Sequence, residues 1–441
     1  MQVSHFNSFL DGGAAAAAGR LHAELMRSGV DSRFYYSASQ GHRPELDASY
    51  VAARWQRQGL VRDAVAYAKF RGARQSLKRI TKQRPVGLEV FSSPQGSPHT
   101  PWPPTQHVDR EDGNILHLHW IAKFLDYRSF FGSLPPDQPV VWTLHDMNAM
   151  TGGCHFSGGC ERFKTGCGGC PQLPSNLATA GENDPSRRYF NEKKLALAGI
   201  DLHIAAPSRW LIDAARSSDL LAGARSFHHI PYGISTNDYY PMDRLEARAR
   251  LGIDPDATVF CFGAMDINNR RKGAREMMQA IASIANLPGV EGLVFGSGML
   301  PDTEHARPKI HHVGAVQGLL NQRAVYSAAD VFVLPSLEDN LPLTGLEAMA
   351  CGTPIVGFDA GGIPDYVRAG QNGYLAQTGN ADDLGEKLRA MLLDAERTAD
   401  MGRRSRHLME TQFGAAREAA AYRSLYADLS GAGQMPRSRA A

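Results

Sequence analysis

Cysteine and long apolar runs are both scarce in this sequence. Only six cysteines occur among 441 residues, too few for a disulfide scaffold, and this favours a reducing compartment. No apolar run approaches the roughly 20 residues needed to span a bilayer. The chain starts MQVSHFN and passes into a Gly/Ala-rich stretch, which does not resemble a signal peptide. These features predict a cytoplasmic protein, soluble or peripheral at the inner face of the membrane.

A large excess of one charge is also missing. The chain has 47 Lys and Arg against 45 Asp and Glu, so its net charge is only +2. This balance argues against a dedicated nucleic-acid-binding protein. Neither GxxxxGK[ST] nor a GxGxxG after the first predicted strand is present, which disfavours nucleotide hydrolysis and dinucleotide redox chemistry.

Positive charge is concentrated locally, in residues 51–84. Lysines and arginines there oppose a single acid, Asp63, and alternate with Trp55, Val61 and Val65. The pattern is typical of a solvated basic helix. It is also compatible with a helix that contacts anionic lipid beside a lipid-linked acceptor. The sequence leaves both interpretations open.

The chain does contain short β-branched or aromatic runs that alternate with longer helical patterns. This alternation is typical of βαβ crossovers and of parallel sheets. Strands are predicted at 3–7, 115–119, 140–144, 202–206, 227–231, 258–262, 292–295, 331–334 and 354–358. The chain is too long for one hydrophobic core. We therefore predict an α/β protein with two Rossmann-like, doubly wound parallel-sheet domains, at 1–240 and 241–412, facing across a cleft. A C-terminal helix at 413–430 is predicted to pack back on the first domain.

Glycines and polar residues follow many of these strands. Ligands of open parallel sheets bind at the carboxyl ends of strands. The positions are Gly12, Gly13, His119, His145, Asp146, Gly263, Gly296, Ser297, Gly298, residues 336–340, Gly361 and Gly362. A glycine there can serve a turn alone, or it can let backbone amides approach phosphate. Their placement in both halves predicts a cleft for a nucleotide diphosphate joined to a sugar.

A basic triplet, Arg270, Arg271 and Lys272, lies just beyond the strand that is predicted to end near Gly263. Such cations stabilise a departing diphosphate without a metal, because negative charge develops on the leaving group. The alternative is a solvated basic turn.

An acidic segment follows at 335–352, PSLEDNLPLTGLEAMACG. Its Asp339 and Glu347 are suited to bind a donor sugar and a ribose, since a carboxylate accepts hydrogen bonds from two hydroxyls. Thr344 and Glu347 also have the spacing of a capping box, in which the glutamate bonds the N-cap amide. The two interpretations are compatible.

Four cysteines, Cys154, Cys160, Cys167 and Cys170, lie in a glycine-rich loop. Only the last pair has the CxxC spacing of a zinc half-site. Structural zinc and free or pairing thiols are both open interpretations.

Three longer segments carry a resemblance to a known family. They are VVWTLHDMNAMTGGCHFSGGCERFKTGCGGCPQL at 140–173, APSRWL at 206–211 and ADVFVLPSLEDNLPLTGLEAMACGTPIVGFDAGGIPD at 329–365. With them, the sequence resembles the retaining family-4 glycosyltransferases of GT-B fold, especially bacterial exopolysaccharide enzymes of the colanic-acid type. The resemblance implies transfer of a sugar from a nucleotide-diphosphate sugar to a carbohydrate or lipid-linked oligosaccharide, with no catalytic metal.

The resemblance also implies residue roles. The family's paired acidic motif falls on Asp339 and Glu347, with Glu338 adjacent, and the first of the pair is usually glutamate. Its diphosphate-binding lysine matches Lys272. Its usual arginine is replaced by Ala264, for which Arg271 or Arg270 substitutes. His145 matches the histidine near the donor sugar. The remaining implied donor contacts are Gly12, Gly13, Gly263, Gly296, Gly298, Asn340, Leu341, Thr344, Gly361 and Gly362.

Two departures from the family pattern support a rival hypothesis. Ala264 and Asp339 replace the usual arginine and glutamate. A non-catalytic, nucleotide-sugar-binding scaffold of a polysaccharide assembly system is therefore the alternative to a transferase.

Overall fold

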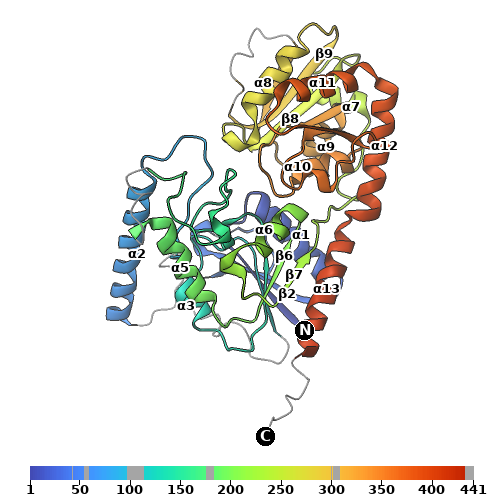
Figure 1. The fold of residues 1–441 in the computed structure, drawn as a ribbon. Coiled ribbons are helices and arrows are strands. Elements are labelled where there is room, and N and C mark those ends of the chain that lie inside the picture. Colours follow the sequence, from blue (N-terminus) through green and yellow to red (C-terminus); the bar gives the residue numbers. More distant parts are fainter. Residues whose placement is uncertain are drawn as a thin grey trace. The chain divides into compact units, whose positions relative to one another are not determined.

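The computed structural model describes residues 1–41, 43–53, 59–96, 114–174, 183–298, 300 and 308–432. The chain divides into two compact units (Figure 1). Unit 1 consists of Met1–Ile230 and Glu418–Ala441, and unit 2 is Pro231–Arg417. Within the described ranges, no helix is long and apolar enough to cross a membrane.

Unit 1 is built on a seven-stranded sheet in the order β3-β2-β1-β4-β5-β6-β7, with parallel pairing throughout. Strands β4, β5 and β6 are fully buried and mostly apolar because helices cover both faces of a parallel sheet. The strands are β1 (Gln2–Asn7), β2 (Asp31–Ser37), β3 (Tyr50–Ala53), β4 (Ile115–Leu118), β5 (Val140–Thr143), β6 (Leu202–Ala206) and β7 (Ser226–His229). The main helices are α1 (Gly13–Arg27), α2 (Leu60–Thr81), α3 (Tyr127–Phe131), α5 (Pro185–Leu197), α6 (Arg209–Arg216) and α13 (Ala415–Ala432).

Unit 2 contains a six-stranded sheet in the order β10-β9-β8-β11-β12-β13, also parallel. Its strands are β8 (Thr258–Asp266), β9 (Val290–Ser297), β10 (Lys309–Gly314), β11 (Val331–Leu334), β12 (Ile355–Phe358) and β13 (Gly373–Ala376). Its helices are α7 (Arg244–Leu251), α8 (Ala274–Ser283), α9 (Leu319–Ala328), α10 (Leu343–Ala350), α11 (Ala381–Leu393) and α12 (Ala395–Gln412). The two sheets confirm the predicted α/β class with two parallel-sheet domains.

Strand lengths in unit 2 differ from the prediction in one important respect. Strand β8 runs to Asp266 and β9 to Ser297. Gly263 and Gly296 therefore lie inside strands, and the prediction that they follow strand ends is wrong. A glycine inside a strand often marks a close approach of neighbouring groups, and the packing around both residues, described below, shows this.

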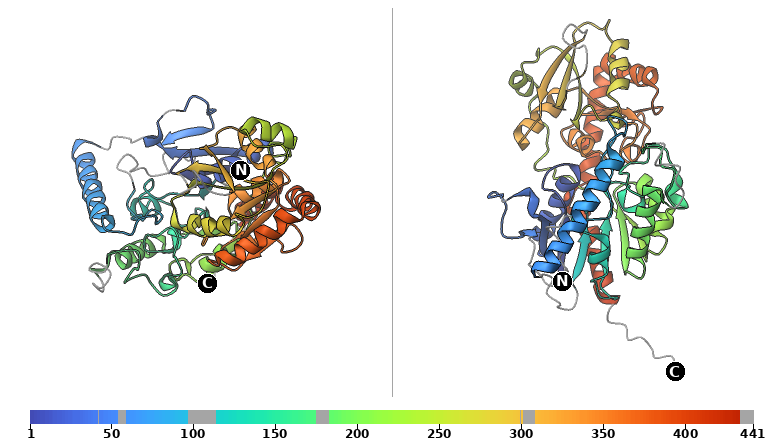
Figure 2. Two further views of the ribbon diagram at one scale, coloured as in Figure 1. Left: turned by 90° about the horizontal axis from the view of Figure 1, so that it is seen from above. Right: turned by 90° about the vertical axis from the view of Figure 1, so that its left-hand side faces the viewer.

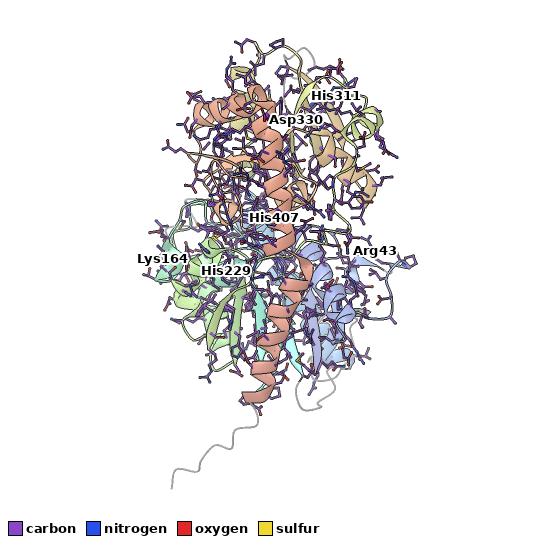
Figure 3. The ribbon with its side chains drawn as sticks, turned by 90° about the vertical axis from the view of Figure 1, so that its right-hand side faces the viewer. Arg43, Lys164, His229, His311, Asp330 and His407 are labelled. Carbon is purple, nitrogen blue, oxygen red and sulfur yellow. The ribbon has the colours of Figure 1, made fainter. Side chains whose placement is uncertain are left out.

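One partly buried carboxylate joins α7 to the unit 2 sheet. Asp330, labelled in Figure 3, accepts hydrogen bonds from Arg248 Nη2 at 2.9 Å and from the Val259 amide at 2.7 Å. It also forms an ion pair with Arg244. Because Asp330 immediately precedes β11, these bonds align α7, β8 and β11.

The C-terminal helix α13 packs on the unit 1 sheet through two tyrosines. The Tyr422 hydroxyl lies 2.6 Å from Thr143 Oγ1, and the Tyr426 hydroxyl lies 2.6 Å from His117 Nδ1. Both tyrosine side chains are completely buried. The last segment of the chain thus completes the core of the unit that the first segment begins.

Helix α2 lies at the margin of unit 1 in Figure 1 and in the left view of Figure 2. Only its C-terminal end joins a hydrophobic cluster, through Leu77 and Ile80. At its N-terminal end Leu60 is 86% exposed and Val61 is 78% exposed. The predicted basic helix is therefore present from residue 60. Residues 54–58, with Trp55, lie outside the described residues.

Candidate active site

Two cations and one buried carboxylate form the centre of the site in unit 2. Lys272 Nζ lies 2.7 Å from Asp339 Oδ2, and Arg271 Nη1 lies 3.1 Å from Asp339 Oδ1. Asp339 is 6% exposed. The two cations come from the short 3-10 helix η7 (Arg270–Lys272), and the carboxylate comes from the loop after β11. Two positive charges against one negative leave a net positive group, which is suited to an anionic ligand.

The pKa of Asp339 is lowered to about 2. Burial alone raises it, but Lys272 and Arg271, and hydrogen bonds from Lys272 and the Asn340 amide, stabilise the charged form more strongly. The carboxylate is therefore ionised at neutral pH. It holds both cations in place.

Two glycines allow the backbone to form this group. Gly273 has φ +71°, and a Cβ on it would lie 1.7 Å from the Pro335 carbonyl oxygen. Gly361 has φ +56°, and a Cβ there would lie 1.7 Å from the Asp339 carbonyl oxygen. The Gly362 amide donates to the same oxygen at 3.1 Å. Loops from three different strands can approach one another here because these positions have no side chain.

Glu347 lies on α10 and is buried. Its Oε2 accepts a hydrogen bond from the hydroxyl of Tyr326, on α9, at 2.7 Å. The predicted capping box with Thr344 is wrong, since α10 begins at Leu343 with Pro342 as N-cap and no side chain caps it. The backbone turn at Pro342 starts the helix, and Glu347 bonds a neighbouring helix instead.

The other predicted contacts of unit 2 differ in their surroundings. Arg270 pairs with Glu276 at 3.1 Å and is half exposed. The Glu338 carbonyl accepts from Arg271 Nη1 at 3.3 Å. Asn340 and Leu341 are buried next to Asp339 in the sequence, in the turn that precedes α10. The structure thus brings Arg271, Lys272 and Asp339 together and directs Arg270 to a different carboxylate.

Three further glycines have steric reasons of their own. A Cβ on Gly263 would lie 2.3 Å from the Phe295 ring, and one on Gly296 would lie 1.7 Å from the Ala264 carbonyl. A Cβ on Gly298 would lie 2.6 Å from Asn268 Nδ2. Close packing therefore accounts for these three glycines without a ligand.

The predicted site residues of unit 1 follow β1 and β5. Gly12 is the N-cap of α1, with φ +95°, and Gly13 is its first residue. His145 comes just after β5, and its Nε2 lies 3.0 Å from His119 Nδ1. Burial lowers the pKa of His145 to about 4, although Asp146 opposes this. The imidazole is therefore neutral at physiological pH.

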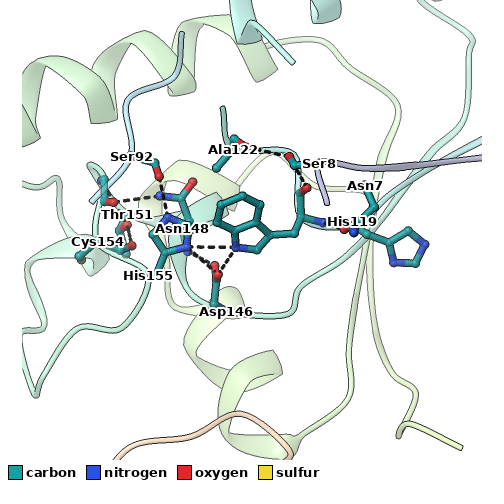
Figure 4. A network of polar contacts seen from close by, with 12 residues as sticks. Asn7, Ser8, Ser92, His119, Ala122, Asp146, Asn148, Thr151, Cys154 and His155 are labelled. Atoms are coloured by element: carbon teal, nitrogen blue, oxygen red, sulfur yellow. Dashed lines mark hydrogen bonds and ion pairs between the residues drawn. The ribbon is translucent and has the colours of Figure 1, made fainter. Parts of the chain in front are cut away.

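Asp146 holds the segment after His145 in place (Figure 4). Its Oδ2 accepts from Trp120 Nε1 and lies beside His155 Nδ1, both at 2.6 Å. The other ring nitrogen of His155 lies 2.8 Å from the Ser92 hydroxyl. Burial raises the pKa of Asp146, but His155 and the other donors lower it overall. This network fixes the start of the cysteine-rich loop.

All four clustered cysteines line one small cavity. Burial raises the pKa of Cys154 and Cys170, and that of Cys167 to about 11. Zinc with four thiolates at about 2.3 Å brings the sulfurs to within about 4 Å of one another. No three of these sulfurs meet within 4.8 Å, and among the described residues only His5, His117 and His119 form such a group. In this arrangement the thiols do not form a preformed zinc site. The zinc interpretation stays a prediction, tested by metal analysis of protein purified without chelators.

Sequence reasoning missed several residues that support the site. Tyr326, which bonds Glu347, occurs in ordinary helix sequence, whereas Ser336, which bonds Asp339, lies in the predicted segment 336–340. The fully buried Lys193 donates to carbonyl oxygens of Asn148 and Thr151 at 2.6 and 3.1 Å. No local pattern marks such partners. The sequence analysis named His119 but not His117, which lies two residues earlier, on β4. The HLH spacing places both side chains on the same side of an extended backbone, so this signal was available.

Residues 256–394 match the family described as Glycosyl transferases group 1. The chain is 31% identical over 222 residues to "D-inositol 3-phosphate glycosyltransferase 1" of Catenulispora acidiphila, covering 46% of this chain and 53% of that protein. It is 25% identical over 381 residues to "Putative colanic acid biosynthesis glycosyl transferase WcaC" of Escherichia coli, and the match covers 81% of this chain and 82% of that protein. For several curated relatives it spans about half their length, 51 to 58%.

Solved structures resemble the chain over nearly its whole length. Sucrose-phosphate synthase from Thermosynechococcus elongatus has a TM-score of 0.64 at 17% identity, covering 98% of this chain and 99% of that one. HepE from Anabaena, in complex with UDP-glucose, has a TM-score of 0.57 at 15% identity, with 97% and 100% covered. WaaG, a glycosyltransferase involved in lipopolysaccharide biosynthesis, has a TM-score of 0.59 at 15% identity, and the match covers 95% of this chain and 98% of that one.

The fold is therefore GT-B, as the sequence predicted. The resemblance to family-4-type GT-B glycosyltransferases is confirmed, and the region with the Lys272, Arg271 and Asp339 group lies within the matched family segment.

Proposed function

We propose that the protein is a glycosyltransferase that moves a sugar from a nucleotide-diphosphate sugar to a carbohydrate or lipid-linked oligosaccharide acceptor. The observation that carries this proposal is the net positive group of Lys272 and Arg271 at the buried Asp339. We assign donor binding to unit 2 and the acceptor side to unit 1.

The proposed donor contacts follow from this group. Lys272 is held 2.7 Å from Asp339 Oδ2, and a cation fixed in this way is suited to phosphate oxygens. Glu347 is assigned to the ribose, and Asp339 with its neighbour Glu338 to the sugar. HepE, which shares the fold, is described in complex with UDP and with UDP-glucose. These complexes support a uridine nucleotide as the first donor to assay.

The proposed reaction retains the anomeric configuration. The bond between the anomeric carbon and the diphosphate oxygen breaks, and a bond from that carbon to the acceptor oxygen forms on the same face. The acceptor hydroxyl proton passes to the departing phosphate oxygen, so no side-chain base is required. Lys272 and Arg271 stabilise the charge that develops on the diphosphate. We propose that no catalytic metal takes part, so chelation with EDTA is expected to leave turnover unchanged.

We further propose a cytoplasmic role in exopolysaccharide or cell-surface glycan synthesis. The similarity to a putative colanic acid glycosyltransferase over 81% of the chain supports it. The exposed Leu60, Val61 and Val65 of α2, interspersed with basic residues, support peripheral contact with anionic lipid. Binding to vesicles that contain anionic lipid, compared with neutral vesicles, tests this contact.

The decisive experiment incubates the full chain with a panel of nucleotide sugars and candidate acceptors. Nucleotide release identifies the donor, and the anomeric configuration of the product tests retention. The rival function, a non-catalytic nucleotide-sugar-binding scaffold, is favoured by Ala264 at the position of the family's arginine. Saturable donor binding with no nucleotide release under any acceptor would support the scaffold and contradict the transferase.

A further inference from the structure

Three histidines of unit 1 form a continuous hydrogen-bonded chain that ends at His145. His5 Nδ1 lies 2.9 Å from His119 Nε2, and His119 Nδ1 lies 3.0 Å from His145 Nε2. The three residues come from β1, the end of β4 and the loop after β5, which are neighbours in the sheet. His5 and His119 are completely or almost completely buried.

Burial keeps these rings neutral. It lowers the pKa of His5 and His119 well below the usual value, and the neighbouring rings of His117 and His22 lower it further. Asp146 acts on the pKa of His145 in the opposite direction, but burial outweighs it. A neutral imidazole has one N–H and one bare nitrogen. His119 therefore donates one of its two hydrogen bonds and accepts the other. Both hydrogen bonds thus have the same donor-to-acceptor direction along the row of three histidines.

Only two directions are possible. If the protons point inward, His145 donates to His119, His119 donates to His5, and the proton of His5 lies on Nε2. If they point outward, His5 donates to His119, His119 donates to His145, and His5 Nε2 is a bare acceptor. The directions differ in what they leave at His5 Nε2 and at His145 Nδ1.

The surroundings of His5 distinguish the two directions. Within the described part of the chain, the buried His5 Nε2 has no hydrogen-bond partner. Buried N–H groups without an acceptor are rarer in proteins than buried acceptors without a donor. The inward direction would leave such an N–H in the core. The outward direction leaves only an unpaired lone pair.

We infer that the hydrogen bonds between the three histidines point outward, from His5 to His119 to His145. This direction holds His145 as the Nδ1–H tautomer, so that its ring offers a hydrogen-bond donor, and not a base, to an oxygen of the sugar. His5 and His119 are then positioning residues that act through His145. The inference rests on the proposed function only in naming a sugar as the partner of His145. It also agrees with a transfer in which the leaving phosphate takes the acceptor proton.

The tautomer is measurable without any activity. Long-range ¹⁵N–¹H correlation spectra of the full chain, labelled on histidine, distinguish a protonated ring nitrogen from a bare one. The His145 signals are identified by their loss in His145→Asn. We expect a protonated Nδ1 and a bare Nε2 at pH 7.5. A protonated Nε2 on His145 would overturn the inference, even if the protein turns over a nucleotide sugar.

Variants of the middle ring test the positioning role. His119→Phe keeps the ring but removes both nitrogens, so His145 is expected to lose its single tautomer. The kcat of His119→Phe is expected to fall about tenfold or more. A well-placed hydrogen-bond donor contributes about 10²–10³-fold to kcat, and a misdirected donor loses part of this contribution. His119→Asn retains an amide N–H near Nδ1 and should restore both readouts in part. An unchanged His145 spectrum in His119→Phe contradicts the inference.

His203→Phe is the matched control. His203 is also a buried histidine of this sheet, on β6, and it bonds Ser226 outside the chain of three rings. The variant should leave the His145 spectrum and kcat unchanged. If His119→Phe does not fold, the wild-type spectrum still decides the direction. A wild-type Nδ1–H tautomer without any sugar transfer would refute the proposed function and leave the tautomer assignment intact.

Discussion

At the scale of single residues, Lys272 and Asp339 dominate the candidate site. The lysine side chain is 22% exposed, and its charge is held 2.7 Å from a buried carboxylate. A surface lysine would be free to rotate, whereas the bond to Asp339 gives this one a defined position. Residues with this combination of charge and restraint are suited to stabilise charge that develops in a transition state.

Replacing Lys272 with alanine is expected to lower kcat/KM by about 10²–10³-fold, because a preorganised cation at the leaving group is lost. Nucleotide release in the assay described above measures it. The control is Lys309→Ala, which removes an exposed lysine of the same unit that faces Glu291 on the sheet edge. Near-normal turnover of Lys272→Ala would refute its role at the diphosphate.

Asp339 also predicts a pH dependence of stability. Its pKa in the folded protein is about 2, below the usual 3.8. The ionised carboxylate therefore stabilises the folded state fully above about pH 4, and this stabilisation is lost as the pH falls through the pKa of the folded protein. The contribution to the free energy of unfolding is about 2–3 kcal/mol, at about 1.4 kcal/mol per pKa unit. The difference in unfolding free energy between wild type and Asp339→Asn should shrink between pH 5 and pH 2.5. A constant difference would contradict the ionised pair.

At the scale of elements, the turn between η7 and α8 determines where the cations lie. Gly273 has a left-handed backbone conformation and packs against the Pro335 carbonyl, in the segment that contains Asp339. The Leu337 amide also donates to the Arg271 carbonyl at 2.7 Å. Backbone contacts thus hold the basic and acidic segments together in addition to the side-chain ion pairs.

Gly273→Ala is expected to destabilise unit 2 by more than the left-handed conformation alone, which costs about 1–2 kcal/mol. The matched control is Gly252→Ala at the end of α7, where φ is +66° and a Cβ would meet nothing within 4 Å. Urea unfolding of both variants separates conformational strain from collision with Pro335. Equal losses of stability would show that the collision is relieved at no cost.

Helix α5 presents two adjacent lysines with opposite surroundings. Lys193 is fully buried, donates to Asn148 and Thr151, and has its pKa lowered to about 8 mainly by burial. Lys194 is half exposed and pairs with Asp219 at 2.8 Å. One lysine anchors the start of the cysteine-rich loop, and the other lies at the surface.

We expect Lys193→Met to destabilise unit 1 by about 2–5 kcal/mol, because buried carbonyl oxygens lose their donor. Lys194→Met should cost less than about 1 kcal/mol, as for other exposed ion pairs. Thermal unfolding with limited proteolysis of the loop measures both effects. Similar stabilities of the two variants would contradict the anchoring role of Lys193.

At the scale of the whole molecule, the chain leaves unit 1 and later returns to it. The segment that leaves unit 1 forms backbone hydrogen bonds with the segment that returns to it. The Ile234 amide donates to Phe413 O at 2.7 Å, and the Ala415 amide donates to Ile234 O at 3.1 Å. Helix α13 then supplies Ala419, Tyr422 and Tyr426 to a hydrophobic cluster of unit 1. Unit 1 is therefore complete only after the last helix has been made.

A chain that ends at Arg417 is expected to be poorly soluble, because it exposes the buried cluster that includes Val3, Val141 and Ala205. A chain that ends at Ala432 keeps every described residue of α13 and is the control. Soluble yield and hydrophobic-dye binding compare the two. A well-folded, soluble product ending at Arg417 would show that unit 1 does not need α13.

Some strands could be read from the sequence and others could not. Residues 202–206 and 331–334 were predicted with the observed bounds, because parallel strands inside a sheet are wholly or mostly apolar. The strands at 31–37, 50–53, 309–314 and 373–376 were missed. β3, β10 and β13 are edge strands, and edge strands such as KIHHVG in β10 carry polar residues that break the pattern.

By itself, the sequence determined the α/β class, two parallel sheets, the family resemblance and the positions of the basic and acidic segments, because periodicity and motifs are local properties. Only the tertiary structure decided that Lys272 and Arg271 bind Asp339 while Arg270 binds Glu276. It also decided that Glu347 bonds Tyr326 instead of capping its helix, and that His5, His119 and His145 join in one chain. These pairings depend on which strands become neighbours, and contacts between residues far apart in the chain leave no local pattern.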